Sequence, residues 1–151
     1  MALYPNTRTP LQRVTQGSVT INGEVIGKTG PGLVIFACAM QGDTIQNVKV
    51  TAKKILNLRI VKDEDARMNR SLLDTGGSVV IISQLRLSAD TSRCNRPGFS
   101  TAAPPDIGKA LYNQLCDTIE GYGVTVARGQ FGGDMKVGLS DDGPVTIWVE
   151  K

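Results

Sequence analysis

The sequence of 151 residues predicts a single mixed α/β domain that covers residues 1–151. Three observations predict this fold class: a hairpin of two β-rich runs, a continuous apolar run directly after it, and two stretches of helical periodicity separated by further strand-like runs. The sequence contains no internal repeat and no linker-like segment. We therefore expect one hydrophobic core.

The first predicted elements are a hairpin and a central strand. The β-rich runs 14–21 and 24–27 flank Asn22-Gly23, a pair typical of the tight turns that join antiparallel strands. After the break at residues 30–32, residues 33–40 are continuously apolar, as expected of a strand that is covered on both faces. This run is therefore predicted to lie at the centre of the sheet.

Two helices are predicted. Asp43 can cap the first, and Gln46 three residues later completes the pattern of a capping box. Its apolar residues recur at helical spacing, at Ile45, Val48, Ala52 and Ile55. The second helix begins after Pro104-Pro105, since proline is tolerated in the first turn, and runs to Gly121.

Strand-like runs occupy much of the remaining chain. Residues 58–61 and 78–88 are predicted to be strands, separated by the polar stretch 63–77, and residues 124–149 supply the last strands. This order of hairpin, strand, helix, strands, helix and closing strands indicates helices packed on one mixed sheet.

Composition favours a cytoplasmic protein. Hydrophobic residues make up 40% of the chain and charged residues 21%. No apolar run reaches the length of a membrane span, and residues 1–6 lack the basic start and apolar stretch of a signal peptide. The net charge of +3 and the pI near 8.9 permit a polyanionic partner without requiring one.

The chain contains no histidine. This excludes Ser-His-Asp and Cys-His catalytic arrangements and any metal site that needs histidine. Cys38, Cys94 and Cys116 are odd in number and widely spaced, which argues against a disulfide framework or a cysteine zinc site and favours packing residues or free thiols. We therefore expect neither a metal nor another cofactor.

Two segments carry candidate functional residues. If residues 79–90 continue as a strand, alternation places Gln84 and Arg86 on one face and Ser83 and Leu85 on the other. The alternative is a half-buried strand whose polar end simply reaches solvent. Farther along, an aromatic ring and an adaptable thioether flank a glycine pair and could sandwich a nucleobase or pack in the core. These residues are Phe131 and Met135.

A third candidate is the Gly143-Pro144 pair, which follows Asp141-Asp142 where a turn is predicted to enter the last strand. Glycine permits close approach of another group, and an X-Pro bond can be held in either isomer. The pair can therefore present backbone to a ligand, or it can simply form a turn at the start of an edge strand.

Many short motifs occur together in a fixed order. They are Gln12-Arg13-Val14, Lys54-Ile55-Leu56-Asn57-Leu58-Arg59-Ile60, Met68-Asn69, Ser71-Leu72-Leu73-Asp74, Ser83-Gln84, Ala89-Asp90-Thr91, Arg96-Pro97, Ala102-Ala103-Pro104-Pro105, Phe131-Gly132, Asp134-Met135 and Asp142-Gly143-Pro144-Val145-Thr146. In this combination the chain, from about Leu11 to Trp148, resembles the D-aminoacyl-tRNA deacylases, also called D-tyrosyl-tRNA deacylases.

The resemblance implies a β2-(αβ)2-β3-like arrangement in three layers, α/β/β, and a homodimer formed through the sheets with its active sites at the subunit interface. It implies hydrolysis of the ester between a D-amino acid and the terminal adenosine of tRNA, so that the partner is the CCA end of aminoacyl-tRNA, with no DNA and no membrane involved. In such a protein a cis Gly-Pro pair reaches into the partner's site, where its backbone carbonyls engage the substrate amino group and exclude an L side chain.

The resemblance also assigns residues to roles. Gly143 and Pro144 match the Gly-Pro pair, Arg13 matches an arginine that orients it, and Phe131 and Met135 match the adenine pocket. Asp141 stands where the family often has asparagine. This carboxylate could attract an α-ammonium group, although a turn cap is the favoured interpretation.

The chain departs from the family in the catalytic segment. The family usually reads Ser-Gln-Phe-Thr-Leu, whereas this chain reads Ser83-Gln84-Leu85-Arg86-Leu87, so the threonine hydroxyl is absent. In one interpretation, backbone N–H groups near Gln84 and Leu85 hold the oxyanion while water attacks with help from the RNA 2′-hydroxyl, as proposed for the family. Ser83 is a poor substitute nucleophile because no histidine can activate it.

In the other interpretation, Arg86 fills or recharges the pocket. The protein would then accept altered substrates or bind tRNA ends without catalysis. The guanidinium could also pair with a phosphate near the CCA end or with Asp90. Arg93 and Arg96 lie in a basic loop and are further candidates for phosphate contacts, unless the loop is merely solvated.

Overall fold

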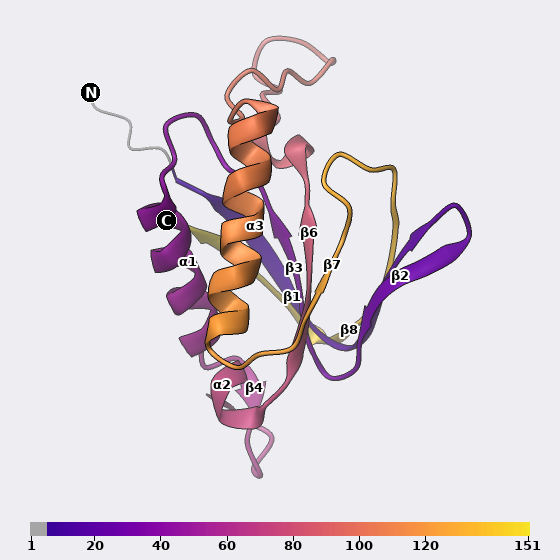
Figure 1. The fold of residues 1–151 in the computed structure, drawn as a ribbon. Helices are drawn as coiled ribbons and strands as arrows, with labels where there is room; N and C mark the ends of the chain where they lie inside the picture. The colour runs from indigo at the N-terminus through magenta and orange to yellow at the C-terminus, as the bar shows by residue number, and fades with distance from the viewer. Residues whose placement is uncertain (1–5) are drawn as a thin grey trace.

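The computed structural model describes residues 6–151 and contains one mixed sheet with helices on one face (Figure 1). The elements in chain order are β1 (Arg8–Ile21), β2 (Glu24–Thr29), β3 (Gly32–Ala37), α1 (Ile45–Asn57), β4 (Val61–Lys62), β5 (Met68–Arg70), α2 (Leu72–Thr75), β6 (Ser78–Ser83), the 3-10 helix η1 (Leu85–Ser88), α3 (Pro105–Gly121), β7 (Val126–Arg128) and β8 (Lys136–Glu150). None of these helices is long and apolar enough to cross a bilayer.

The predicted hairpin and the central strand are confirmed. The sheet has the order β2-β1-β3-β6-β7. β8 pairs with β1 along the edge of β1 that faces away from β2 and β3. β1 pairs antiparallel with β2, β3 and β8, while β3 and β6, and then β6 and β7, run parallel. β3 therefore lies between β1 and β6, as its continuous apolar sequence predicts. The strands β4 and β5 form a small separate hairpin.

The core lies between one face of the sheet and the two long helices, which lie side by side across it (Figure 1). α1 contributes Val48, Ala52 and Ile55, and α3 contributes Leu115 and Ile119, all at most 1% exposed. Their spacing of three and four residues places them on one face of each helix. The second helix begins and ends as predicted, with proline in its first turn.

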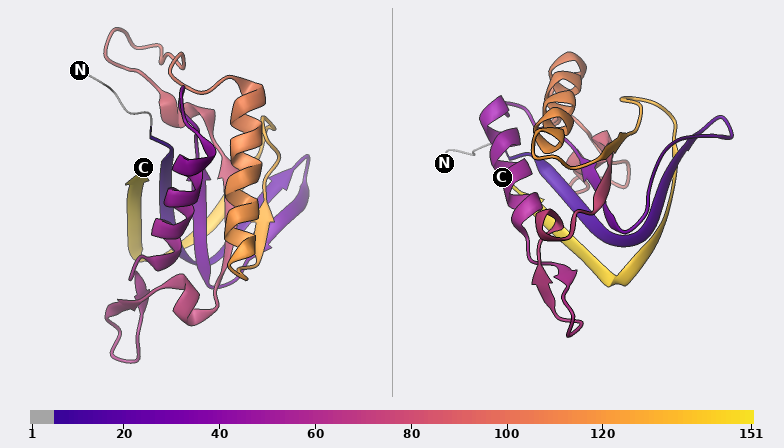
Figure 2. Two further views of the ribbon diagram at one scale, coloured as in Figure 1. Left: turned by 60° about the vertical axis from the view of Figure 1, so that its left-hand side comes forward. Right: turned by 60° about the horizontal axis from the view of Figure 1, so that its bottom comes forward.

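The opposite face of the sheet is partly covered by the sheet itself. β1 continues past β3 into the hairpin with β2, and this part curls away from the helices together with β8 (Figure 2). A second apolar cluster fills the concave side. At the closing edge, a Cβ on Gly27 of β2 would lie 3.2 Å from the Cβ of Ala127 on β7, so glycine permits this approach. The predicted α/β/β layers therefore arise from one strongly curved mixed sheet.

The first helix is capped one residue later than predicted. Thr44 is the N-cap and forms the capping box with Asn47, in place of Asp43 and Gln46. The Asp43 carboxylate instead accepts hydrogen bonds from the Thr7 hydroxyl and the Met40 N–H, at 2.9 and 2.8 Å. It thus ties the chain before β1 to the turn before the helix.

Two strand predictions need correction. Of residues 58–61 only Val61 is in a strand, because the Arg13 guanidinium, rather than a neighbouring strand, takes the carbonyl of Ile60. The strand predicted at residues 78–88 ends at Ser83, where its pairing with β3 ends at Ala37. The chain then turns into η1 because no further strand is available to pair with it.

The parallel pairing of β3 and β6 generates a test. A Cβ on Gly32 would lie 1.7 Å from the Ser78 carbonyl oxygen, whereas one on Gly30 would meet no atom within 4 Å. We expect Gly32→Ala to lower the free energy of unfolding by about 3 kcal/mol, because the strands must separate, and Gly30→Ala to change it by less than about 0.5 kcal/mol. Urea unfolding of both variants measures this, and equal stabilities would contradict the expectation.

Candidate functional site

Two clefts open at the end of the sheet where β3 and β6 terminate. One, of about 680 Å³, is lined by Phe36, Ile82, Ser83, Gln84, Arg86, Gly132, Gly133, Asp134, Met135 and Val137. The other, of about 630 Å³, is lined by Gln41, Ser83, Leu85, Arg86, Phe99, Ala102, Ala103, Pro104, Pro105, Phe131, Gly132 and Gly133. The clefts share Ser83, Arg86 and the Gly132-Gly133 pair, so they meet there.

The catalytic segment predicted from the sequence forms this junction, in a different conformation from the one expected. The Gln84 N–H donates to the Ala37 carbonyl at 2.9 Å and ends the sheet, after which the chain enters the 3-10 turn. Alternation therefore does not apply beyond Ser83. The prediction that Ser83 faces away from Gln84 and Arg86 is wrong, because all three line the same cleft.

The turn leaves two backbone donors available. Within residues 6–151, the N–H groups of Leu85 and Arg86 have no backbone acceptor, because the first residues of a helical turn lack one inside the turn. The Leu85 carbonyl, in contrast, accepts from the Ser88 hydroxyl at 2.8 Å. The donors that can face an oxyanion are therefore those of Leu85 and Arg86, one residue later than the predicted pair, since the N–H of Gln84 is occupied.

The Arg86 side chain is exposed and has no ion pair or hydrogen bond within the described residues. The pairing of the Arg86 guanidinium with Asp90, which the sequence left open, is therefore wrong. The Asp90 carboxylate accepts from the backbone N–H and hydroxyl of Ser92, at 2.9 and 2.6 Å, and these bonds lower its pKa. Arg86 therefore brings an uncompensated positive charge to the junction of the clefts.

Phe131 and Met135 lie on opposite sides of the glycine pair. Phe131 lines the cleft with Phe99, whereas Met135 lines the cleft with Gln84. Phe131 packs on Tyr112 of α3 at 6.1 Å between ring centroids. The thioether of Met135 accepts from the Gln130 N–H. Each side chain therefore supplies an apolar wall to a different one of the two adjoining clefts, and a nucleobase held between them stays a prediction.

Sequence reasoning missed Phe99 and Gln41, and it used the Pro104-Pro105 pair only as a helix start and as part of a family motif, without a place in a cleft. Phe99 is one of three phenylalanines in the chain and stands in a polar loop, a signal that its ring contacts something other than the core. Gln41 fixes this loop, because its amide donates to the Ser100 carbonyl at 2.6 Å.

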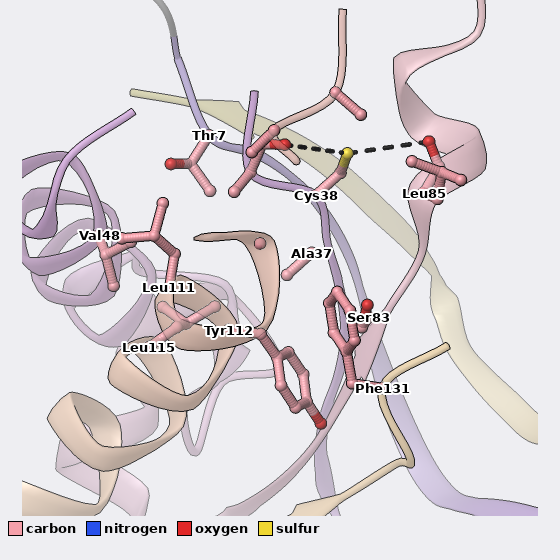
Figure 3. Close-up of a pocket in the computed structure, with 14 residues that line it drawn as sticks. Thr7, Ala37, Cys38, Val48, Ser83, Leu85, Leu111, Tyr112, Leu115 and Phe131 are labelled. Atoms are coloured by element: carbon pink, nitrogen blue, oxygen red, sulfur yellow. Dashed lines mark hydrogen bonds between the residues drawn. The ribbon is translucent and has the colours of Figure 1, made fainter. Parts of the chain in front are cut away.

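Beneath the clefts lies a small apolar cavity of about 40 Å³ (Figure 3). Ser83 and Phe131 form one side and the helical residues Val48, Leu111 and Leu115 form the other. Burial raises the pKa of the Cys38 thiol, which lines this cavity, to about 11. The thiol stays protonated at neutral pH and is no candidate nucleophile.

The Gly143-Pro144 pair lies within β8 instead of before it. Register passes from Gln12 opposite Thr146 to Val14 opposite Asp141, so that residues 142–145 of β8 face Arg13 alone. This bulge exposes Gly143 and Pro144, and the peptide bond between them is cis, the isomer that the resemblance implies. The expected turn is therefore a protrusion from a continuous strand.

Hydrogen bonds of buried and partly buried side chains hold this bulge. Arg13, 5% exposed, donates to the carbonyls of Asp142 and Ile60, both at 2.9 Å. The Asp141 carboxylate accepts from the Val145 N–H at 2.8 Å and from Gln12 at 2.7 Å. Asp141 is thus the turn cap that was favoured over an ammonium-binding role.

Within one chain the bulge and the clefts are far apart. Arg13 pairs with Leu33 at the start of β3, whereas Ser83 pairs with Ala37 at its end, about 13 Å along the strand at roughly 3.3 Å per residue. The bulge also lies on the side of β1 that faces away from β3. Gly143 and Pro144 line neither cleft of their own chain.

Arg93 and Arg96 are exposed in the loop closed by the bridge between Asp90 and Gly98. They lie after η1 and before α3, but neither lines the two clefts. Their contact with phosphate stays a prediction. Cys38, Cys94 and Cys116 are free thiols, as expected.

Comparisons with known proteins agree with the fold. The D-aminoacyl-tRNA deacylase of Cereibacter sphaeroides (strain KD131 / KCTC 12085) is 54% identical over 143 residues, which cover 95% of this chain and 99% of that protein. A solved structure of a c-Myc DNA unwinding element binding protein is 31% identical with a TM-score of 0.89, covering 95% of this chain and 98% of that one. A probable eukaryotic D-amino acid tRNA deacylase, at 18% identity and a TM-score of 0.84, covers 97% of this chain and all of that one and shares the fold.

The curved mixed sheet with its helices on one face is therefore the fold of the deacylases. The family model described as D-Tyr-tRNA(Tyr) deacylase matches residues 10–150. The chain belongs to this family.

The contacts of Asp141 generate a prediction. Asp141→Ala removes the acceptor of the Val145 N–H, so we expect a loss of about 1–2 kcal/mol in the free energy of unfolding and faster amide exchange at Val145. Asp141→Asn keeps a carbonyl oxygen and is the matched control, with a smaller loss. Unfolding titrations and hydrogen exchange by NMR measure both. Unchanged exchange at Val145 in Asp141→Ala would show that the carboxylate does not hold the bulge.

Proposed function

We propose that this protein hydrolyses the ester bond of D-aminoacyl-tRNA and so releases a free D-amino acid and tRNA. The observation that carries the proposal is the match over nearly the whole chain to the D-aminoacyl-tRNA deacylases at up to 54% identity. The clefts fit this substrate class, since one has an aromatic wall for a nucleobase and the junction holds free backbone donors. We further propose that the protein acts in the cytoplasm.

The chemistry that these residues support needs no side-chain nucleophile. With the terminal adenosine against Phe131, the ester carbonyl would lie at the junction, where the N–H groups of Leu85 and Arg86 can stabilise the oxyanion. Water would attack with help from the 2′-hydroxyl of the RNA. Ser83 lines the junction and Gln84 lines one of the clefts beside it, and both would position this water. The reaction then survives the replacement of threonine by Arg86.

Selection by chirality would come from the bulge of a second subunit. Its exposed backbone at Gly143 and Pro144 lies too far from its own clefts to act there, which supports a homodimer in which each bulge enters the partner's cleft. Carbonyl groups of the pair would accept from the substrate ammonium, and an L side chain would collide with them. Arg13 would keep the bulge in this position.

Hydrolysis is tested with D- and L-tyrosyl-tRNA and the purified protein. We expect release from the D ester to exceed release from the L ester by at least about 100-fold, because only the L side chain meets the bulge. Equal rates would contradict stereospecificity. Binding without release, with activity restored in Arg86→Thr, would instead identify a non-catalytic binder of tRNA ends.

A second prediction tests whether each site combines the cleft of one subunit with the bulge of the other. A Cβ on Gly143 would lie 2.9 Å from an Arg13 nitrogen and 2.8 Å from a Val145 methyl, so Gly143→Ala should displace the bulge, while Gln84→Ala should damage only the cleft. A heterodimer isolated with two tags has one intact site, and we expect about half of the wild-type activity from two variants that are each inactive alone. A heterodimer without activity would place bulge and cleft of one site in the same chain.

A further inference from the structure

The guanidinium of Arg86 is the charged group without a partner at the junction of the clefts. The cleft with the aromatic wall contains no other charged lining residue, whereas Asp134 lines the other cleft. An anion that approaches from the side of Phe99 therefore meets one positive charge and no carboxylate. Both clefts fall within the range of about 300–1,000 Å³ typical of small-molecule sites.

The lining of this cleft fits a nucleotide. Phe99 and Phe131 offer aromatic surface, and Pro104 and Pro105 add apolar surface without backbone N–H groups. A base stacked here would carry its phosphate within reach of a side chain that lines the same cleft. Arginine suits phosphate because its planar donors can bind two oxygens at once.

We propose that Arg86 binds the phosphodiester on the 5′ side of the terminal adenosine. This inference rests on the proposed function, because it takes the terminal adenosine to lie in the cleft with Phe131. It assigns to Arg86 a role in holding the RNA end. A threonine in the same place could not perform this role, because its side chain is uncharged. We therefore expect tighter binding of a substrate with this phosphate than of an aminoacyl adenosine without it.

The test compares two minimal substrates, the D-tyrosyl ester of adenosine and the same ester of 5′-AMP. For the wild-type protein we expect the 5′-phosphate to lower KM by about tenfold to 100-fold, the range of a hydrogen bond to a charged group, with kcat nearly unchanged. In Arg86→Gln this advantage should disappear. Lys53→Gln on the exposed face of α1 removes the same charge away from the clefts and should keep it.

Binding of 5′-AMP and adenosine, measured by calorimetry, separates the two proposals. If neither ester is hydrolysed but 5′-AMP binds more tightly than adenosine only when Arg86 is present, the proposed hydrolysis fails and the phosphate contact stands. If both esters are hydrolysed equally well by wild type and by Arg86→Gln, the hydrolysis stands and the phosphate contact is overturned. Equal affinity of the wild-type protein for both ligands would also overturn it.

Discussion

The structure depends on the parallel pairing of β3 with β6. At the start of this pairing the strands approach so closely that only glycine fits, at Gly32 beside Ser78. At its end the Ala37 carbonyl takes the N–H of Gln84, and the chain leaves the sheet. The position of that last bond fixes where η1 begins and therefore which backbone donors remain free. The location of the candidate chemistry is thus a consequence of strand register.

A second constraint acts at the other end of β3. Arg13 is buried in the sheet, yet its guanidinium donates to the carbonyls of Ile60 before β4 and of Asp142 in the bulge, and it lies 3.6 Å from the Asp142 carboxylate. A buried charge is tolerated only with such partners, so the same contacts that satisfy Arg13 also hold the protruding backbone. The shape of the bulge therefore depends on the hydrogen bonds that the buried guanidinium of Arg13 requires.

Much of the fold was predictable from local sequence. Asn22-Gly23, the apolar run before the first helix and the proline start of α3 each specify their element through short-range chemistry. The end of β6 was not predictable, because residues 84–88 keep a strand-like sequence and only the length of the neighbouring strand decides where pairing stops. The cleft role of Phe99 was equally hidden, since it depends on a loop folding back beside η1. The Gly143-Pro144 pair stands out in the sequence as a candidate, but its place inside a strand follows from long-range register with β1.

The bulge in β8 and the two clefts are formed by different sets of side chains. The residues that bind its backbone come from β1 and from β8, whereas the clefts are lined mainly by β6, η1 and the loops around residues 99 and 132, together with Phe36 of β3 and Val137 near the start of β8. No side chain contributes to both groups. Substitutions in one group therefore leave the packing of the other intact, so a side chain that lines the clefts, such as Arg86, can change while the bulge keeps its shape.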